Sequence, residues 1–132
     1  MPQFEIPIRV YIEDTDAGGI VYYVNYLKFM ERARTEYLRR LGYGKAALFD
    51  DDKMFVVHSL KTGYHKSAEL DDELVVTAAI QHTSRTTVLF EQKVLRGEEV
   101  LCDGEVKVAC VSRLTRKPVA MPAELVRRID SV

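Results

Sequence analysis

The feature that most constrains the fold is one long segment of helical period in a chain that otherwise alternates like β-strands. Apolar residues recur at helical spacing from about Val24 to Leu41, and charged residues fill most positions between them. Gly42 follows the last apolar residue, as glycine commonly does after a helix. We therefore predict a single long amphipathic helix over residues 24–41.

Segments with a two-residue period lie on both sides of this helix. Residues 4–12 alternate in this way, and Pro7 indicates an edge strand. Four further strands are predicted at residues 56–64, 74–82, 88–94 and 100–110, and a short terminal helix at 122–129. This order indicates an α+β fold, with the helix packed on a strongly curved antiparallel sheet of about five strands.

Two of these strands have faces of distinct character. In the first, one parity carries Val56, His58, Leu60, Thr62 and Tyr64. We expect His58, on this apolar parity, to be an interior or interface residue rather than a catalytic one. In the last strand, Asp103, Glu105 and Lys107 share a parity, so that face is expected to meet water or a polar interface. The opposite face of this strand carries Val100, Cys102, Gly104, Val106, Val108 and Cys110.

Chain length and sheet geometry together predict a self-associating single domain. A chain of 132 residues is typical of one domain, here residues 1–132. One helix cannot cover both faces of the predicted sheet, and two strand edges stay open. We therefore expect a homo-oligomer, either a homodimer or a homotetramer.

Charge and cysteine usage exclude several classes of partner. The chain has 19 basic and 20 acidic side chains, so no general basic field favours nucleic acid or an anionic membrane. The N-terminus does not fit a signal peptide and no apolar run would span a bilayer, so a cytoplasmic protein is expected. Cys102 and Cys110 are too far apart along one strand for a disulfide, and the histidine and cysteine spacing predicts no metal site.

An acidic turn, "EDTDAGG", directly precedes the helix. Asp14, Asp16 and the two glycines suit a capping turn, because aspartate accepts local N–H bonds and glycine tolerates positive φ. The same residues also suit chemistry, because a helix N-terminus can stabilise an oxyanion and Asp16 can act as a nucleophile or general base. A thioester suits so weak a nucleophile better than an amide does. The residues alone slightly favour the structural interpretation.

The segment "DTDAGGIVYYVNY" resembles the active-site signature of the hotdog-fold 4-hydroxybenzoyl-CoA thioesterases. It is most similar to the branch of bacterial acyl-CoA thioesterases encoded with the Tol–Pal genes. The resemblance covers nearly the whole chain, including "ERARTEYLRRLG", "ELDDEL" and "KPVAMP". It implies a hotdog fold and hydrolysis of an acyl-CoA to a free acid and coenzyme A, without a cofactor.

The resemblance also implies roles for individual residues. Asp16 matches the catalytic carboxylate, while Gly19 and Tyr23 match the turn and the helix start, where the Tyr23 backbone N–H would polarise the thioester carbonyl. Relatives in the Tol–Pal branch often have histidine at the position of Tyr23, and its absence leaves Asp16 as the only strong side-chain catalyst. Asp14 remains a turn or cap residue. Tyr11 and Asn25 lie near the site by analogy.

Substrate contacts are implied by the same resemblance. His58 and Ser59 are expected near a subunit interface, where they would contact substrate across a dimer, so an isolated monomer should be inactive. Cationic residues in two turns would bind the coenzyme A phosphates or simply solubilise the loops: Arg85, Arg113, Arg116 and Lys117.

Two other functions are weighed against a thioesterase. A hotdog acyl-thioester dehydratase would usually have a histidine in or near the helix, and residues 13–42 contain none. A non-catalytic binding partner of acyl-CoA or acyl carrier protein in envelope lipid metabolism would not need Asp16. The sequence leaves open the acyl chain length, an aromatic or aliphatic preference, the pathway, and whether Asp16 is nucleophile or base.

Overall fold

The computed structural model describes residues 4–43 and 52–131. Within them, one antiparallel sheet has the strand order β1-β3-β4-β5-β2. A long helix, α1, follows β1 and a short helix, α3, follows β5. The bounds are β1 Phe4–Arg9, α1 Val24–Arg40, β2 Lys53–Tyr64, β3 Glu73–Thr83, β4 Thr87–Arg96, β5 Glu99–Ser112 and α3 Ala123–Asp130. The predicted α+β architecture is confirmed, although the first strand ends at Arg9 rather than near residue 12.

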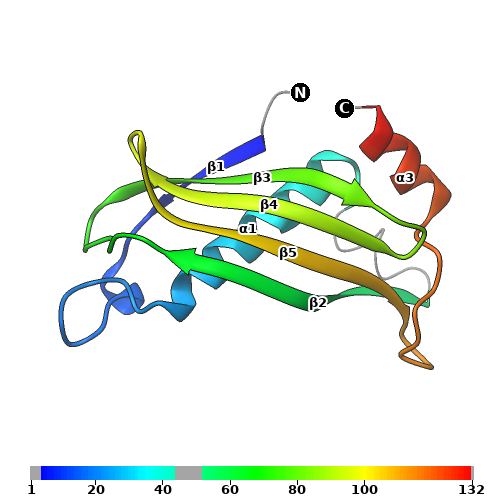
Figure 1. Cartoon of the computed structure of the whole chain (residues 1–132), viewed down its shortest axis with the longest axis horizontal. Coiled ribbons are helices and arrows are strands. Elements are labelled where there is room, and N and C mark those ends of the chain that lie inside the picture. Colours follow the sequence, from blue (N-terminus) through cyan, green and yellow to red (C-terminus); the bar gives the residue numbers. More distant parts are fainter. Residues whose placement is uncertain (1–3, 44–51, 132) are drawn as a thin grey trace.

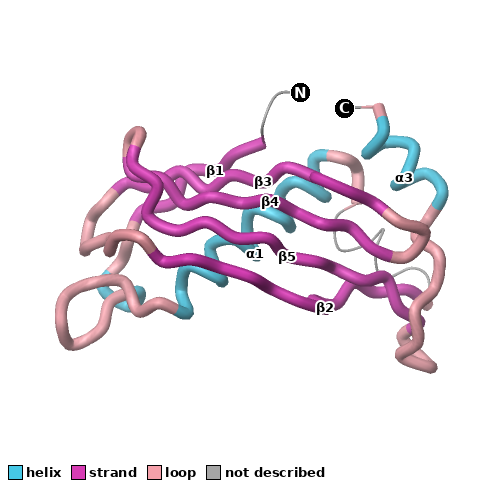
Figure 2. Tube along the Cα trace, in the orientation of Figure 1, coloured by secondary structure: helices cyan, strands magenta, loops and turns pink. Residues whose placement is uncertain are grey.

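The sheet curves around α1, which lies across one of its faces (Figures 1 and 2). Phe29, Met30 and Ala33 of α1 are buried in one apolar core that also contains Phe90 and Val94 of β4. At the far end of α1, Gly42 adopts a φ of 89°, as the C-cap pattern predicted. Cys102 and Cys110 are buried free thiols. No helix in the described ranges is long and apolar enough to cross a bilayer.

A polar group lies inside this apolar core. The Gln92 amide nitrogen donates to the Met30 carbonyl oxygen at 2.9 Å and to the Thr77 carbonyl oxygen at 3.2 Å. Its amide oxygen accepts a bond from Arg34 Nη1 at 2.9 Å. Burial lowers the pKa of the Arg34 guanidinium. Gln92 therefore joins the middle of α1 to strands β3 and β4.

A β-bulge at His58 corrects the predicted face of β2. Val57 pairs with Val108, but Ser59 pairs with Lys107, so His58 is the extra residue. The bulge switches the parity, and the helix-facing side carries Val57 before it and Leu60 after it. The prediction that one parity runs from Val56 to Tyr64 is wrong for this reason. His58 is exposed in the single chain rather than interior.

A second irregularity lies between β4 and β5. Val94 pairs with Cys102, whereas Leu95 pairs with Val100, so Leu101 is the bulged residue. Leu101 is fully buried while Val100 is only partly so. The predicted buried parity of β5 therefore begins at Cys102, and not at Val100.

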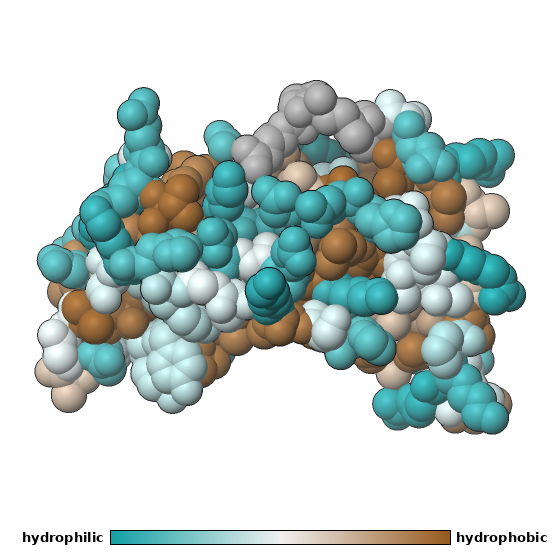
Figure 3. All heavy atoms as spheres, viewed as in Figure 1, coloured by the Kyte–Doolittle hydropathy of each residue, from teal (hydrophilic) through white to brown (hydrophobic). Residues whose placement is uncertain are grey.

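The two edges of the sheet differ in character. β1 pairs only with β3 and contains Pro7, which confirms the edge prediction. β2 forms the other edge and exposes Val57 by 53% and Leu60 by 42%. In Figure 3, hydrophilic side chains cover much of the visible face, with apolar patches between them.

We predict that Gln92→Ala lowers the free energy of unfolding by about 2–4 kcal/mol. The substitution removes the acceptor of a buried guanidinium and the donor to two carbonyl oxygens. Urea denaturation would measure the change. The exposed Gln81→Ala on β3 is the control, with an expected change within about 0.5 kcal/mol. Equal losses for the two variants would contradict the role given to Gln92.

Candidate active site

The acidic turn is a tight hairpin that carries Asp16 at its tip. Thr15 bridges to Val21, and the Asp16 N–H donates to the Ile20 carbonyl oxygen at 2.9 Å. Asp16 Oδ1 accepts the Gly18 N–H at 2.8 Å. Gly19 has a φ of 80°, a conformation that favours glycine. The Asp16 side chain is exposed, and its Oδ2 accepts no hydrogen bond from the described residues.

Asp14 ties this hairpin to the start of α1. Its carboxylate accepts the Tyr11 N–H at 2.9 Å, and its carbonyl oxygen accepts the Tyr22 N–H at 2.9 Å and Asn25 Nδ2 at 2.8 Å. The structure therefore shows Asp14 as a turn residue, and its side chain does not cap α1. Asn25 is buried, and its amide nitrogen is committed to holding the hairpin.

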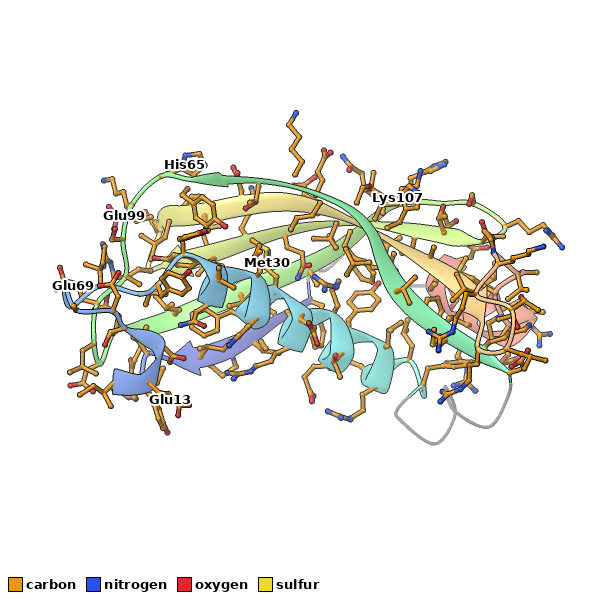
Figure 4. All side chains as sticks on the ribbon, turned by 90° about the horizontal axis from the view of Figure 1, so that it is seen from below. Glu13, Met30, His65, Glu69, Glu99 and Lys107 are labelled. Carbon is orange, nitrogen blue, oxygen red and sulfur yellow. The ribbon has the colours of Figure 1, made fainter. Side chains whose placement is uncertain are left out.

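The N-terminus of α1 is open beside the hairpin. No side chain caps it, and the Tyr23 N–H has no acceptor among the described residues. Unpaired N–H groups and the positive end of the helix dipole favour an anion or a developing oxyanion. Figure 4 shows the labelled Glu13 and Glu69 at the end of the molecule where α1 begins.

A cluster of tyrosines packs between the start of α1 and the end of β2. The Tyr23 ring lies 5.0 Å from Tyr22 and 5.8 Å from Tyr64, and Tyr26 lies 5.8 Å from Tyr64. Burial raises the pKa of Tyr26 and Tyr64, which favours their neutral phenol forms. The exposed ring areas form an apolar wall near the helix end, with Tyr23 exposed by 57% and Tyr64 by 43%. Sequence reasoning missed Tyr22 and Tyr64 as site residues.

The hairpin rests on residues 67–72, which we call the support loop. Ile20 bridges to Glu69, and the Val21 N–H donates to the Ala68 carbonyl oxygen at 2.9 Å. On the other side of Asp16, the Val10 N–H donates to the Asp72 carbonyl oxygen at 2.9 Å. The chain segments before and after Asp16 are thus held by the same loop.

The predicted coenzyme A contacts lie away from this site within one chain. Arg85 is in the β3–β4 turn, and Arg116 and Lys117 are in the turn after β5. These turns adjoin, because the Met121 N–H donates to the Arg85 carbonyl oxygen at 3.0 Å. They lie at the opposite end of the sheet from the hairpin (Figure 1). A single chain therefore does not bring these cations to Asp16.

The remaining predicted substrate contacts are also dispersed. His58 and Ser59 are exposed near the middle of β2. Tyr11 is exposed and lines a groove of about 540 Å³ between β1 and α1, together with residues such as Ile8 and Glu31. In residues 4–43 and 52–131, no three His, Cys, Asp or Glu side chains are grouped to hold a metal ion.

We predict that Gly19→Ala costs about 1–2 kcal/mol of stability, because alanine resists the left-handed conformation. It should also slow the hydrolysis of acyl-CoA thioesters that the sequence resemblance implies, because the Gly19 N–H donates to the Asp16 carbonyl oxygen at 3.0 Å. Gly42→Ala is the control. Gly42 also has a positive φ, and a Cβ there would crowd the Arg128 side chain beyond the far end of α1. Gly42→Ala should therefore destabilise the protein without slowing hydrolysis. Equal rate losses would contradict the prediction.

Comparison with known proteins identifies the family. Residues 18–103 match the Thioesterase superfamily. The chain is 47% identical over 123 residues to the acyl-CoA thioesterase YbgC of Haemophilus influenzae, covering 92% of this chain and 90% of that protein. It is 42% identical to the acyl-CoA thioester hydrolase YbgC of Escherichia coli O157:H7, over 93% of this chain and 92% of that one. The crystal structure of a probable thioesterase from Bartonella henselae matches with a TM-score of 0.87 at 30% identity, over 92% of this chain and 100% of that one. The resemblance to hotdog-fold thioesterases is confirmed, and the chain belongs to the thioesterase superfamily.

Proposed function

We propose that this thioester hydrolase cleaves acyl-CoA with Asp16 as the reacting carboxylate and the N-terminus of α1 as the oxyanion site. One observation carries the proposal. The hairpin presents an exposed carboxylate beside an uncapped helix end, and Asp14 ties the two together through Tyr22 and Asn25. The relatives from Haemophilus influenzae and Escherichia coli are named acyl-CoA thioesterase and acyl-CoA thioester hydrolase, which supports acyl-CoA as the substrate class.

The arrangement suits two routes. As a general base, Asp16 takes a proton from water while the water oxygen adds to the thioester carbonyl; the C–S bond then breaks and coenzyme A leaves as the protonated thiol. As a nucleophile, Asp16 forms a mixed anhydride with release of coenzyme A, and water then hydrolyses the anhydride. In each route the Tyr23 N–H and the helix dipole stabilise the oxyanion, and no cofactor takes part.

We further propose that the active unit is a homodimer formed through β2. Pairing β2 with the same strand of a second copy would cover its open edge and the exposed Val57 and Leu60. His58 and Ser59 lie at the middle of β2, close to where a two-fold axis would cross. Antiparallel pairing would also turn one chain's Arg85, Arg116 and Lys117 toward the other chain's hairpin. This explains why cations suited to coenzyme A phosphates lie so far from their own Asp16.

A non-catalytic binder of acyl-CoA or acyl carrier protein is the alternative function. It would use the same tyrosine wall and the same turns but would not need a carboxylate beside the helix end. In our proposal the protein instead turns over cytoplasmic acyl-CoA. Hydrolysis near the background rate for a broad acyl-CoA panel would favour the binder.

We expect Asp16→Asn to lower kcat by about 10²–10⁴-fold, because the amide can neither accept a proton nor attack the thioester. Assays of free thiol release from several acyl-CoAs would measure the loss. Tyr23→Phe is the matched control in the same site, and it should change kcat little because the proposed donor is its backbone N–H. Wild-type turnover by Asp16→Asn would refute the assignment, and a large kcat loss in Tyr23→Phe would show that the phenol takes part.

We expect Val57→Lys to yield a monomer with most of its hydrolysis lost, because a charge on this exposed residue of the edge strand β2 would lie beside the proposed interface. Sedimentation and thiol release, measured on the same sample, would test this. Glu5→Lys, at an exposed residue of β1 on the opposite edge of the sheet, is the control and should keep both assembly and rate. A fully active Val57→Lys monomer would contradict the dimeric site.

A further inference from the structure

Arg96, at the end of β4, binds both ends of the support loop. Its Nη1 donates to Asp72 Oδ2 at 2.7 Å and to the Ser67 carbonyl oxygen at 3.3 Å. Its Nη2 donates to Glu99 Oε1 at 2.8 Å, and Glu99 also pairs with Lys66 at 2.6 Å. One guanidinium therefore fastens the loop to the β4–β5 hairpin of the sheet.

The shape of the support loop depends on the carboxylate that Arg96 holds. Asp72 Oδ2 also accepts the Glu69 N–H at 2.8 Å, which closes the loop on itself. Asp71 between them has a φ of 69°, a conformation that a non-glycine residue keeps only where its surroundings enforce it. The Glu69 N–H and Arg96 together hold the pKa of Asp72 below its usual value.

The support loop holds the segments before and after Asp16 through main-chain contacts. Ala68 and Glu69 bind the hairpin after Asp16, at Val21 and Ile20 respectively. Asp72 binds the segment before Asp16, at Val10. The Ala68 N–H in turn donates to the Tyr26 hydroxyl of α1 at 2.8 Å, so the loop also touches the helix whose N-terminus faces the hairpin.

We infer that Arg96 is a positioning residue for catalysis, which fixes the Asp16 carboxylate relative to the N-terminus of α1 by way of the support loop. The inference rests on the proposed role of Asp16. Arg96 contacts residues of the loop and the β4–β5 hairpin and acts only through them. A displacement of about 1 Å in a reacting group can cost about 100-fold in rate. A support loop that is less firmly held should therefore lower kcat.

Arg96→Gln tests the inference by the division of its effect between kcat and KM. We expect kcat to fall by about 10- to 100-fold while KM changes by less than about 3-fold, because the acyl-CoA contacts are elsewhere. Arg127→Gln on α3 is the control, since it also removes an ion pair but lies far from the loop along the chain. Wild-type kcat in folded Arg96→Gln would overturn the inference.

Arg96→Lys keeps the test decisive if the glutamine variant does not fold. Lysine retains the charge but cannot reproduce the fork that reaches Ser67, Asp72 and Glu99 together. We expect it to fold and still lose several-fold in kcat, and an unchanged kcat would overturn the inference.

The double variant Asp16→Asn/Arg96→Gln shows whether Arg96 acts through Asp16. If it does, adding Arg96→Gln to Asp16→Asn should slow single-turnover hydrolysis by less than about 2-fold, because no carboxylate remains to be misplaced. Losses that multiply would overturn the inference while leaving the role of Asp16 intact. Wild-type turnover by Asp16→Asn alone would instead overturn the proposed function, and this inference with it.

Discussion

Backbone hydrogen bonds between the Asp16 hairpin and the support loop determine where the proposed catalytic carboxylate stands. The Val21 N–H to the Ala68 carbonyl oxygen and the Val10 N–H to the Asp72 carbonyl oxygen clamp the chain on both sides of Asp16. Each such bond contributes only about 1 kcal/mol of net stability, so its importance lies in geometry. Without them, the segment between β1 and α1 would be held only by the bonds of Asp14 near the start of α1, and we would expect it to be more mobile.

Different elements of the fold supply the different groups of the proposed site. The helix supplies N–H donors at its uncapped end, the hairpin supplies a carboxylate, and the tyrosines around Tyr23 and Tyr64 supply an apolar wall. In our proposal, a second copy supplies the cations for the coenzyme A phosphates. The open edge of β2 and the distant cationic turns then have one explanation, which is that a second copy completes the site. Each chain by itself lacks cations beside its own Asp16.

Sequence reasoning succeeded where a repeating pattern or a local motif carried the signal. The period of α1 and the alternation of the strands predicted the architecture, and the signature around Asp16 located the candidate site. Reasoning failed at His58 and Leu101, because a bulge adds a single residue and leaves no mark on the alternation around it. It also missed the Arg96–Asp72 pair, whose members are 24 residues apart and meet only through the fold.

The central claim is that the Asp16 carboxylate performs the chemical step while other groups bind the thioester. Rapid-quench measurement of a single turnover, with enzyme in excess over acyl-CoA, observes this step directly. The account predicts that Asp16→Asn binds acyl-CoA at the same concentrations as the wild-type enzyme does. It should then cleave the C–S bond of the bound thioester at least about 100-fold more slowly. Cleavage of the bound thioester at the wild-type rate would contradict it.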